Sequence, residues 1–230
     1  MKTYVQAINE TLHEIMEVDE RIIIIGACCV TSPWYVGRTL EGIKDRFPNR
    51  IIDAPVSENA ITGAAVGAAI AGLRPILVFP RMDFMLYAMD PIINSAAKWH
   101  YMFGGAMSIP LVIWTIINRG GSQGAQHSQD FTWLFRRIPG LKVVSPQTPD
   151  EARGLLTWAV KDPNPVVYVD DRARYKIEGE VPEKSRMVRE FCVRNLYFFL
   201  KGKWPDPFCP VPASEVLEEA YFEQLSNPVR

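Results

Sequence analysis

The pattern of apolar and polar positions alternates between two periods along most of the chain. Residues 4–16 repeat apolar side chains at helical spacing with charged residues between them, which predicts an amphipathic first helix. Residues 21–26 (RIIIIG) form a continuous β-branched run that ends in glycine, as in a strand buried on both faces of a parallel sheet. The chain is therefore expected to begin with a helix followed by a buried strand.

The same alternation continues to residue 169 and predicts the rest of the domain. Thr148 before Pro149 is typical of a helix N-cap followed by proline at the first helical position. Strands that alternate with helices of this length predict a doubly wound α/β fold, with a mainly parallel sheet and helices on both faces. Further helices are expected over 37–47, 57–72, 84–101, 131–137 and 149–161, and further strands over 50–53, 75–79, 110–115, 141–144 and 165–169.

The composition changes after residue 179. Residues 181–230 hold 6 of the 18 prolines, and the run PDPFCPVP at 205–212 is incompatible with a central strand or a helix interior. Residues 214–225 are expected to form a terminal helix with Ser214 as its cap. We therefore expect one domain over 1–179 and a short Pro-rich tail over 180–230.

Composition and charge narrow the classes of partner. The 230 residues carry 25 Lys and Arg against 26 Asp and Glu, so no basic excess predicts a nucleic-acid partner. No apolar run reaches the roughly 18–20 residues that span a bilayer, and the N-terminus has no apolar signal core, so we expect a cytoplasmic protein without a membrane partner. The cysteines are expected to be reduced, buried thiols: Cys28, Cys29, Cys192 and Cys209.

Ligands of open parallel sheets bind outside the carboxyl ends of the strands, so the loops that follow strands are the candidate sites. In 53–59 (DAPVSEN), Glu58 starts a helix of very small residues. Two interpretations stay open: Ser57 caps the helix while Glu58 complements its dipole, or the Glu58 carboxylate acts on a ligand. The glycine and alanine face of this helix predicts close contact with another helix or subunit.

Two further loops carry candidate chemistry. The glycine-rich segment 118–129 contains His127, whose imidazole can transfer protons near neutral pH, whereas His13 and His100 lie within predicted helices. In 80–90, Phe84 is open to interpretation either as core packing or as part of a binding site. No cluster has metal-ligand spacing, and neither GxGxxG nor GxxxxGK occurs.

Four stretches carry a resemblance to a known family. They are PVSENAITGAAVGAAIAGLRPI, DPIINSAAKWHYMFGG, GAQHSQ and IPGLKVVSPQTPDEARGLL, in that order. The chain resembles the β subunit of thiamine diphosphate-dependent 2-oxoacid dehydrogenases of the pyruvate, branched-chain and acetoin complexes, whose matching domain is also the pyrimidine-binding domain of transketolase. The resemblance extends from the N-terminus to about Arg172.

This resemblance implies a shared active site. An α-type partner in an α2β2 heterotetramer would hold the diphosphate of thiamine diphosphate and its Mg²⁺, and this chain would hold the aminopyrimidine, which accounts for the missing phosphate motif. Glu58 matches the activating glutamate, whose carboxyl hydrogen-bonds a pyrimidine nitrogen, with Asn59 beside it; Phe84 matches the aromatic that stacks on the pyrimidine, and His127 a histidine that faces the substrate. The family also binds K⁺, mainly through backbone carbonyls, at positions matched here by Leu111, Ala159, Asp162 and Asn164.

Two departures accompany the resemblance. Gly26 is followed by Ala27 and Cys28, where the family has an acidic residue after the glycine. The family's second α/β domain is expected to survive only as the remnant 180–230, which favours a stand-alone enzyme over a component of a giant complex.

The resemblance implies a β-type subunit that helps decarboxylate a 2-oxoacid or cleave a ketose, and that transfers the acyl or ketol unit. The alternatives are a true dehydrogenase component that acylates lipoamide, and a non-catalytic regulatory or scaffolding subunit.

Overall fold

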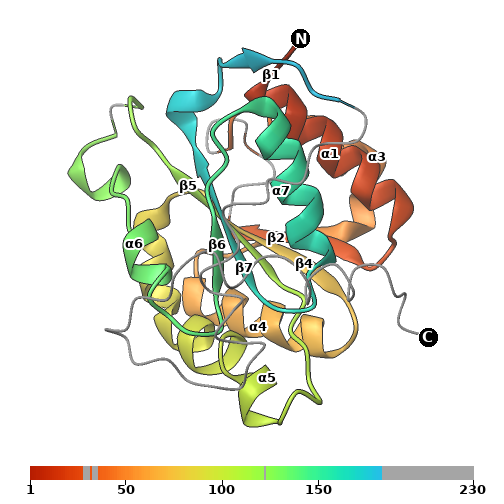
Figure 1. Ribbon diagram of the computed structural model, residues 1–230, viewed down its shortest axis with the longest axis vertical. Coiled ribbons are helices and arrows are strands. Elements are labelled where there is room, and N and C mark those ends of the chain that lie inside the picture. Colours follow the sequence, from red (N-terminus) through yellow and green to blue (C-terminus); the bar gives the residue numbers. More distant parts are fainter. Residues whose placement is uncertain (28–31, 33–35, 122, 183–230) are drawn as a thin grey trace, which may run out of the picture.

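The computed structural model describes residues 1–182 except 28–31, 33–35 and 122 (Figure 1). Four expectations therefore lie outside the described residues: the four buried thiols, the departure after Ala27, the proline cluster 205–212 and the terminal helix 214–225.

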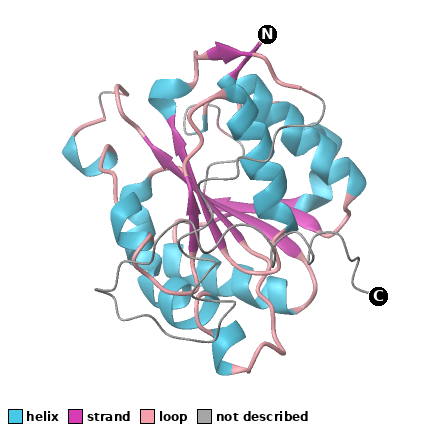
Figure 2. Cartoon of the chain, in the orientation of Figure 1, coloured by secondary structure: helices cyan, strands magenta, loops and turns pink. Residues whose placement is uncertain are grey.

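The centre of the domain is a six-stranded sheet in which every neighbouring pair is parallel (Figure 2). Its order is β3-β2-β4-β5-β7-β6, so the chain winds first to one side of β2 and then to the other. This confirms the doubly wound α/β fold. The strands are β2 (Ile22–Ala27), β3 (Ile51–Ala54), β4 (Arg74–Phe79), β5 (Val112–Ile117), β6 (Lys142–Val144) and β7 (Val166–Asp171).

Helices cover both faces of the sheet because both faces are apolar. Along β2, Ile22 and Ile24 belong to one buried cluster and Ile23 and Ile25 to the other, as expected when successive side chains point to opposite faces. Helices α1 (Tyr4–Val18) and α7 (Pro149–Lys161) complete the first cluster, and α4 (Glu58–Ile70) completes the second (Figure 1). The strand predicted from RIIIIG thus lies in a sheet that separates two apolar cores, each covered by helices.

The two ends of the domain are joined by a small antiparallel sheet that the sequence did not predict. Strand β1 (Lys2–Thr3) pairs with β8 (Glu178–Gly179), which follows the short helix η5 (Arg172–Arg174). Beside it, the Tyr4 ring stacks on Tyr175 with ring centroids 6.3 Å apart. These contacts fix the segment that follows β7 against the first helix.

The predicted helix over 37–47 is wrong in extent. Within 37–47 only α3 (Ile43–Arg46) is helical, and it is followed by η1 (Pro48–Arg50). Gly37 and Gly42 both adopt positive φ, 63° and 72°, which a right-handed helix does not tolerate. The apolar residues of this segment are buried as their spacing predicted, but the two glycines turn the backbone and so prevent one continuous helix.

The single helix predicted over 84–101 is also wrong. The segment is divided into the 3₁₀ helix η2 (Met82–Ala88), the π-helical turn η3 (Pro91–Ala96) and α5 (Trp99–Met102). Proline has no backbone N–H, so Pro91 cannot continue the hydrogen bonding of a preceding helix and begins a new one. The later short helix is α6 (Thr132–Phe135).

The strand order defines a switch point at the carboxyl ends of β2 and β4. From β2 the chain moves to β3 on one side, whereas from β4 it moves to β5 on the other. Loops that diverge in this way leave a crevice between them, which is where ligands bind in open α/β sheets. The segment Pro80–Phe84 starts at this point.

Candidate functional site

Glu58 is the first residue of α4, which follows β3 at the carboxyl edge of the sheet. Ser57 takes the N-cap position with φ −157° but its side chain makes no capping hydrogen bond, so the Ser57 cap predicted from sequence is absent. Glu58 is partly buried, and its carboxylate makes no hydrogen bond or ion pair with any described residue. The carboxylate at this helix N-terminus is therefore available to a ligand.

Phe84 and His127 meet although they lie 43 positions apart in the sequence. Phe84 belongs to η2 after β4, and His127 ends η4 (Ala125–His127) in the loop after β5. The ring centroids are 5.1 Å apart at an interplanar angle of 83°, an edge-to-face contact. Nδ1 of His127 is buried and has no hydrogen-bond partner among the described residues. The two loops singled out in the sequence thus form one site with an unsatisfied imidazole nitrogen.

Asp83 and Gln129 hold these two loops together, and sequence reasoning missed both. Gln129 donates to Asp83 Oδ1 from Nε2 at 2.7 Å and from its backbone N at 3.3 Å. Asp83 is 6% exposed, and its Oδ2 has no partner among the described residues. Asp83 directly precedes Phe84 and Gln129 follows His127 by two residues, so the pair positions Phe84 relative to His127. An acidic residue directly before Phe84 in a predicted strand-end loop was the available signal.

A second polar network lies beside the first. Arg81 is 2% exposed and donates from Nε to Gln123 Oε1 at 2.5 Å, and Asn118 Nδ2 donates to the same oxygen at 2.7 Å. Arg172 Nη1 donates to Asn118 Oδ1 at 3.2 Å. The ends of β4, β5 and β7 are thus linked by one chain of hydrogen bonds, and none of its members was singled out from the sequence.

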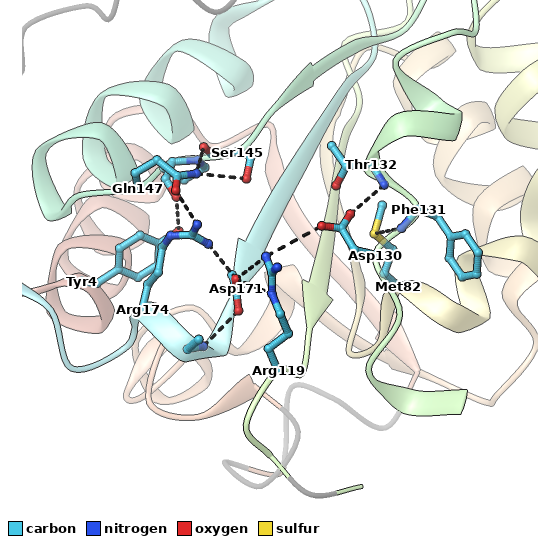
Figure 3. Close-up of polar contacts among 12 residues, drawn as sticks. Tyr4, Met82, Arg119, Asp130, Phe131, Thr132, Ser145, Gln147, Asp171 and Arg174 are labelled. Atoms are coloured by element: carbon cyan, nitrogen blue, oxygen red, sulfur yellow. Dashed lines mark hydrogen bonds and ion pairs between the residues drawn. The ribbon is translucent and has the colours of Figure 1, made fainter. Parts of the chain in front are cut away.

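The carboxyl end of β7 carries two buried carboxyl groups with different surroundings. Asp171 forms ion pairs with Arg119 and Arg174, both at 2.7 Å (Figure 3). Burial raises the pKa of the Asp170 carboxyl to about 7, against hydrogen bonds from the Tyr175 hydroxyl at 2.8 Å and Trp114 Nε1 at 3.3 Å. Asp171 thus forms two ion pairs with arginines, whereas Asp170 accepts hydrogen bonds from two neutral side chains.

Not every predicted cofactor residue joins the Phe84 and His127 pair. Asn59 is exposed on α4 next to Glu58, and no hydrogen bond or ion pair among the described residues connects either one to Phe84 or His127. The predicted K⁺ residues lie at the opposite, amino-terminal edge of the sheet, where Leu111 precedes β5 and Asn164 precedes β7.

One of the predicted K⁺ residues, Asp162, belongs to a buried ion pair. Lys142 Nζ contacts both carboxylate oxygens of Asp162 at 2.6 Å, and Arg74 Nη1 donates to the carbonyl oxygens of Val160 at 2.7 Å and Asp162 at 3.4 Å. The Asp162 carboxylate is therefore already neutralised by a cation of the chain.

Two oxygens at this edge are candidate ligands for a monovalent cation. The Ala159 carbonyl lies four residues before Pro163, which has no N–H to donate to it. Asn164 Oδ1 is buried without a partner among the described residues. Neutral carbonyl and amide oxygens suit a weakly bound cation, so these oxygens, and not the carboxylate, are the candidate donors.

None of the helices in the described part of the chain is long and apolar enough to cross a bilayer.

Fold and site together define a doubly wound parallel α/β domain with a candidate ligand site at the carboxyl edge of its strands. Residues 1–177 match the family described as transketolase, pyrimidine binding domain. The match covers more than half of the chain, and the protein belongs to this family.

The chain is similar to β subunits of two enzymes. The chain is 41% identical over 186 residues to the acetoin:2,6-dichlorophenolindophenol oxidoreductase subunit beta of Cupriavidus necator, covering 77% of this chain and 55% of that one. It is 39% identical over 183 residues to the mitochondrial pyruvate dehydrogenase E1 component subunit beta of Saccharomyces cerevisiae, covering 78% and 49%. The chain spans about half the length of the curated relatives it matches.

A solved structure supports the fold. A structure titled split gene transketolase, inactive beta4 tetramer, is 20% identical with a TM-score of 0.59, covering 78% of this chain and 54% of that one. At this identity the likeness shows the fold alone.

Proposed function

We propose that this chain is the pyrimidine-binding, β-type subunit of a two-subunit thiamine diphosphate enzyme that decarboxylates a 2-oxoacid or cleaves a ketose and transfers the acyl or ketol unit. The observation that carries the proposal is the edge-to-face contact of Phe84 with His127 at the carboxyl edge of the parallel sheet. It brings together a ring for stacking and an imidazole for proton transfer inside the segment that matches the family.

The residues at this edge fit the aminopyrimidine of the cofactor. The Glu58 carboxylate is free of partners among the described residues, and a partly buried carboxylate at a helix N-terminus can share a proton with a ring nitrogen. Phe84 offers a partly buried ring to stack on it, and Asn59 adds an exposed amide next to Glu58. When bound, thiamine diphosphate supplies the nucleophilic carbon and the electron sink that decarboxylation or carbon–carbon cleavage requires.

Side chains of this chain would transfer protons and would orient the imidazole of His127. Glu58 would hold a proton at its carboxyl oxygen, while His127, with its buried Nδ1 available, would bind or protonate an oxygen of the reacting substrate. Asp83 and Gln129 would keep the imidazole in register with the Phe84 ring through their two hydrogen bonds. These roles divide the site into an activating carboxylate and a substrate-facing imidazole.

An α-type partner completes this proposal, with an α2β2 heterotetramer as the assembly and Mg²⁺ held by the partner with the diphosphate. The support on this chain is the outer face of α4, where Gly63, Ala64 and Gly67 are exposed and added Cβ atoms at the two glycines would meet nothing within 4 Å. Nearby Val56 is 68% exposed. A smooth apolar face of this kind permits close approach of another helix.

The domain boundary is part of the same proposal. Residues 1–179 would form the complete cofactor-half domain, closed by the pairing of β1 with β8, whose last residue is Gly179. Residues 180–230 would lie outside this domain.

The decisive experiment reconstitutes the chain with an α-type subunit and compares Glu58→Gln with wild type. Gln keeps the size of the side chain and loses the transferable proton, so turnover should fall at least a thousand-fold while the assembly still forms. Glu41→Gln, at an exposed position remote from the site, is the matched control and should stay active. Full activity of the Glu58→Gln assembly would overturn the assignment.

A K⁺ site at the opposite edge is a separate proposal. The supporting donors are the Ala159 carbonyl and Asn164 Oδ1, with the Leu111 and Asp162 carbonyls beside them. Replacing NaCl by KCl at equal ionic strength should raise the melting temperature of the full chain, and Asn164→Ala should remove the difference. Equal melting temperatures of the wild type in the two salts would contradict this site.

A further inference from the structure

The Asp170 carboxyl lies inside the domain, near the carboxyl end of β7, and its side chain is fully buried. Its Oδ2 accepts hydrogen bonds from the Tyr175 hydroxyl at 2.8 Å and from Trp114 Nε1 at 3.3 Å. Its Oδ1 is buried without a hydrogen-bond partner among the described residues. Two neutral donors on one oxygen do not compensate a buried negative charge, so these surroundings favour the neutral acid.

Tyr175 reaches Asp170 from the segment 172–179, which comprises η5 and β8. The Tyr175 ring stacks on Tyr4 of α1, with ring centroids 6.3 Å apart and an interplanar angle of 20°. The backbone of the segment is docked as well, because the Tyr4 N donates to Ile177 O at 2.8 Å and β8 pairs with β1. The Tyr175 side chain therefore connects the buried end of β7 to the packing of the segment on α1.

Gly37 leaves room for the Tyr175 ring. A Cβ at Gly37 would lie 2.8 Å from Cε2 of Tyr175, so any larger residue there would push the ring away. The turn that begins at Gly37 is tied to α1, since Asn9 Nδ2 donates to Thr39 O at 3.1 Å. The Tyr175 ring thus packs between the first helix and this turn.

Arg174 holds the segment by a separate set of contacts. Its Nη1 pairs with Asp171 at 2.7 Å, and its Nη2 donates to the side chain of Gln147 (Figure 3). Neither contact involves Asp170. Because the segment is held by several separate contacts, the loss of one shifts the balance between its docked and released forms without unfolding the domain.

Asp170 is surrounded by several other charged or titratable groups. The groups that face Asp170 or Tyr175 are Tyr4 of α1, Arg81 after β4, Tyr168 and Asp171 of β7, and Arg172 and Arg174 of the following segment.

The tyrosine hydroxyls of this group stay neutral near neutral pH. Burial raises the pKa of Tyr4, Tyr168 and Tyr175 above its ordinary value of about 10. Burial also raises the pKa of the Asp170 carboxyl, to about 7, and outweighs the hydrogen bonds from Tyr175 and Trp114. Asp170 therefore changes its charge near neutral pH.

We propose that Asp170 and Tyr175 form a proton-sensitive latch, which keeps the segment 172–179 docked while the Asp170 carboxyl is neutral and favours release of the segment when the carboxyl ionises. In the docked state an ionised carboxylate is poorly solvated, and release of Tyr175 gives water access to it. The released state leaves Asp170 with its ordinary pKa of about 3.9, so the docked state binds the proton more tightly. Release should therefore become easier as pH rises from about 4 to 7 and should level off above about 7.

The latch also bears on the loop that carries His127. Arg172 Nη1 donates to Asn118 Oδ1 at 3.2 Å, and Asn118 Nδ2 donates to Gln123 Oε1 at 2.7 Å in the same loop as His127. Release of the segment would remove this support. The latch therefore gives the candidate site a pH dependence that arises outside the site itself.

Amide hydrogen exchange of the full chain, resolved by NMR, tests the latch without requiring activity. Tyr4 is the first residue of α1, so its N–H has no partner within the helix, and its hydrogen bond to Ile177 O reports docking. Its protection factor, which corrects for the intrinsic pH dependence of exchange, should fall at least ten-fold between pH 5 and 7 and change little from pH 7 to 8.

Asp170→Asn should remove this pH dependence, because the amide does not ionise. Glu178→Gln is the matched control, since it neutralises an exposed carboxylate of the same segment, and should keep the wild-type profile. A protection factor of Tyr4 that is constant from pH 5 to 7 in the wild type, or one that falls equally in Asp170→Asn, would overturn the proposal.

Measurements in low concentrations of urea separate local release from global unfolding. Local release exposes little surface, so the protection of Tyr4 and Ile177 should be insensitive to urea below the unfolding transition, whereas that of Ile113 in β5 should fall. The same urea dependence at Ile177 and Ile113 would show that the segment opens only with the whole domain, and would contradict a latch.

Gly37→Ala and Gly42→Ala cover the case in which Asp170→Asn does not fold. Both glycines have positive φ, 63° and 72°, so the backbone strain is matched. A Cβ at 37 would meet the Tyr175 ring at 2.8 Å, whereas at 42 the nearest atom would lie at 3.6 Å. At pH 5, Gly37→Ala should lower the protection of Ile177 about five-fold more than Gly42→Ala. Equal effects would argue against a latch that depends on the packing of Tyr175.

Discussion

Gln129 donates two hydrogen bonds to Asp83, one from its side chain at 2.7 Å and one from its backbone at 3.3 Å, and so ties the loop after β5 to the loop after β4. Asp83 directly precedes Phe84, and Gln129 follows His127 by two residues. The geometry of the candidate site therefore depends on a hydrogen-bonded pair in which Asp83 is buried and Gln129 is exposed.

Asp83→Ala should destabilise the domain and impair the site together. The substitution removes the two hydrogen bonds that the exposed Gln129 donates, each of which contributes about 0.5–1.5 kcal/mol to the free energy of unfolding. Asp83→Asn keeps the Oδ1 acceptor and should cost less. Urea denaturation and turnover of the assembled enzyme measure the two effects, with Asp45→Ala at an exposed position as control. A fully stable Asp83→Ala variant would show that the pair does not hold the loops.

Phe84→Leu should weaken cofactor binding in the assembled enzyme. An aromatic contact contributes about 0.5–1.5 kcal/mol beyond its buried area, so the affinity should fall roughly three- to ten-fold, whereas Phe84→Tyr should keep most of it. Tyr87→Leu is the control, because Tyr87 is 70% exposed on the same short helix. Fluorescence titration with thiamine diphosphate gives the affinities. Similar losses in the Phe84 and Tyr87 variants would argue against stacking on Phe84.

Stability should decrease as pH rises from about 5 to 8 because of Asp170. Its pKa is raised by burial to about 7 in the folded chain, against about 3.9 when unfolded, so the folded state binds more protons between these values. Ionisation at higher pH thus costs stability, on the order of a few kcal/mol. Asp170→Asn keeps an oxygen acceptor for Tyr175 and Trp114 and should be more stable than wild type at pH 8.

The measurement for Asp170 is urea denaturation at pH 5, 6, 7 and 8. The wild type should lose stability across this range, and Asp170→Asn should lose markedly less. Parallel pH profiles of the two proteins would mean that another group governs the dependence.

The two N-caps should differ although both are hydroxyl residues. Thr148 accepts a hydrogen bond from the Glu151 backbone N at 3.2 Å, whereas the Ser57 side chain caps nothing. Thr148→Ala should therefore cost about 1 kcal/mol of unfolding free energy and Ser57→Ala only a few tenths. Chemical denaturation of both variants provides the comparison, and equal costs would show that the difference in capping has no energetic consequence.

Much of the fold could be predicted from periodicity because the strands and helices that build the two cores carry their apolar residues at regular spacing. RIIIIG reads as a doubly buried strand, and the helix over 149–161 was located at its observed bounds because Thr148 and Pro149 mark its start. The prediction of one regular helix over 84–101 was wrong for two reasons. Apolar spacing does not distinguish α, 3₁₀ and π hydrogen bonding, and Pro91 has no backbone N–H to continue the hydrogen bonding of the helix.

The sequence by itself determined the alternation of strands and helices, the loops in which chemistry is concentrated and, through the family resemblance, Glu58, Phe84 and His127 as candidates. Only the tertiary structure decided that Phe84 and His127 touch, that Asp83 and Gln129 hold them there, and that Arg119 and Arg174 share the Asp171 carboxylate. Periodicity records which face of an element is buried, whereas contacts between loops depend on strand order, which brings residues together that lie 40 or more positions apart.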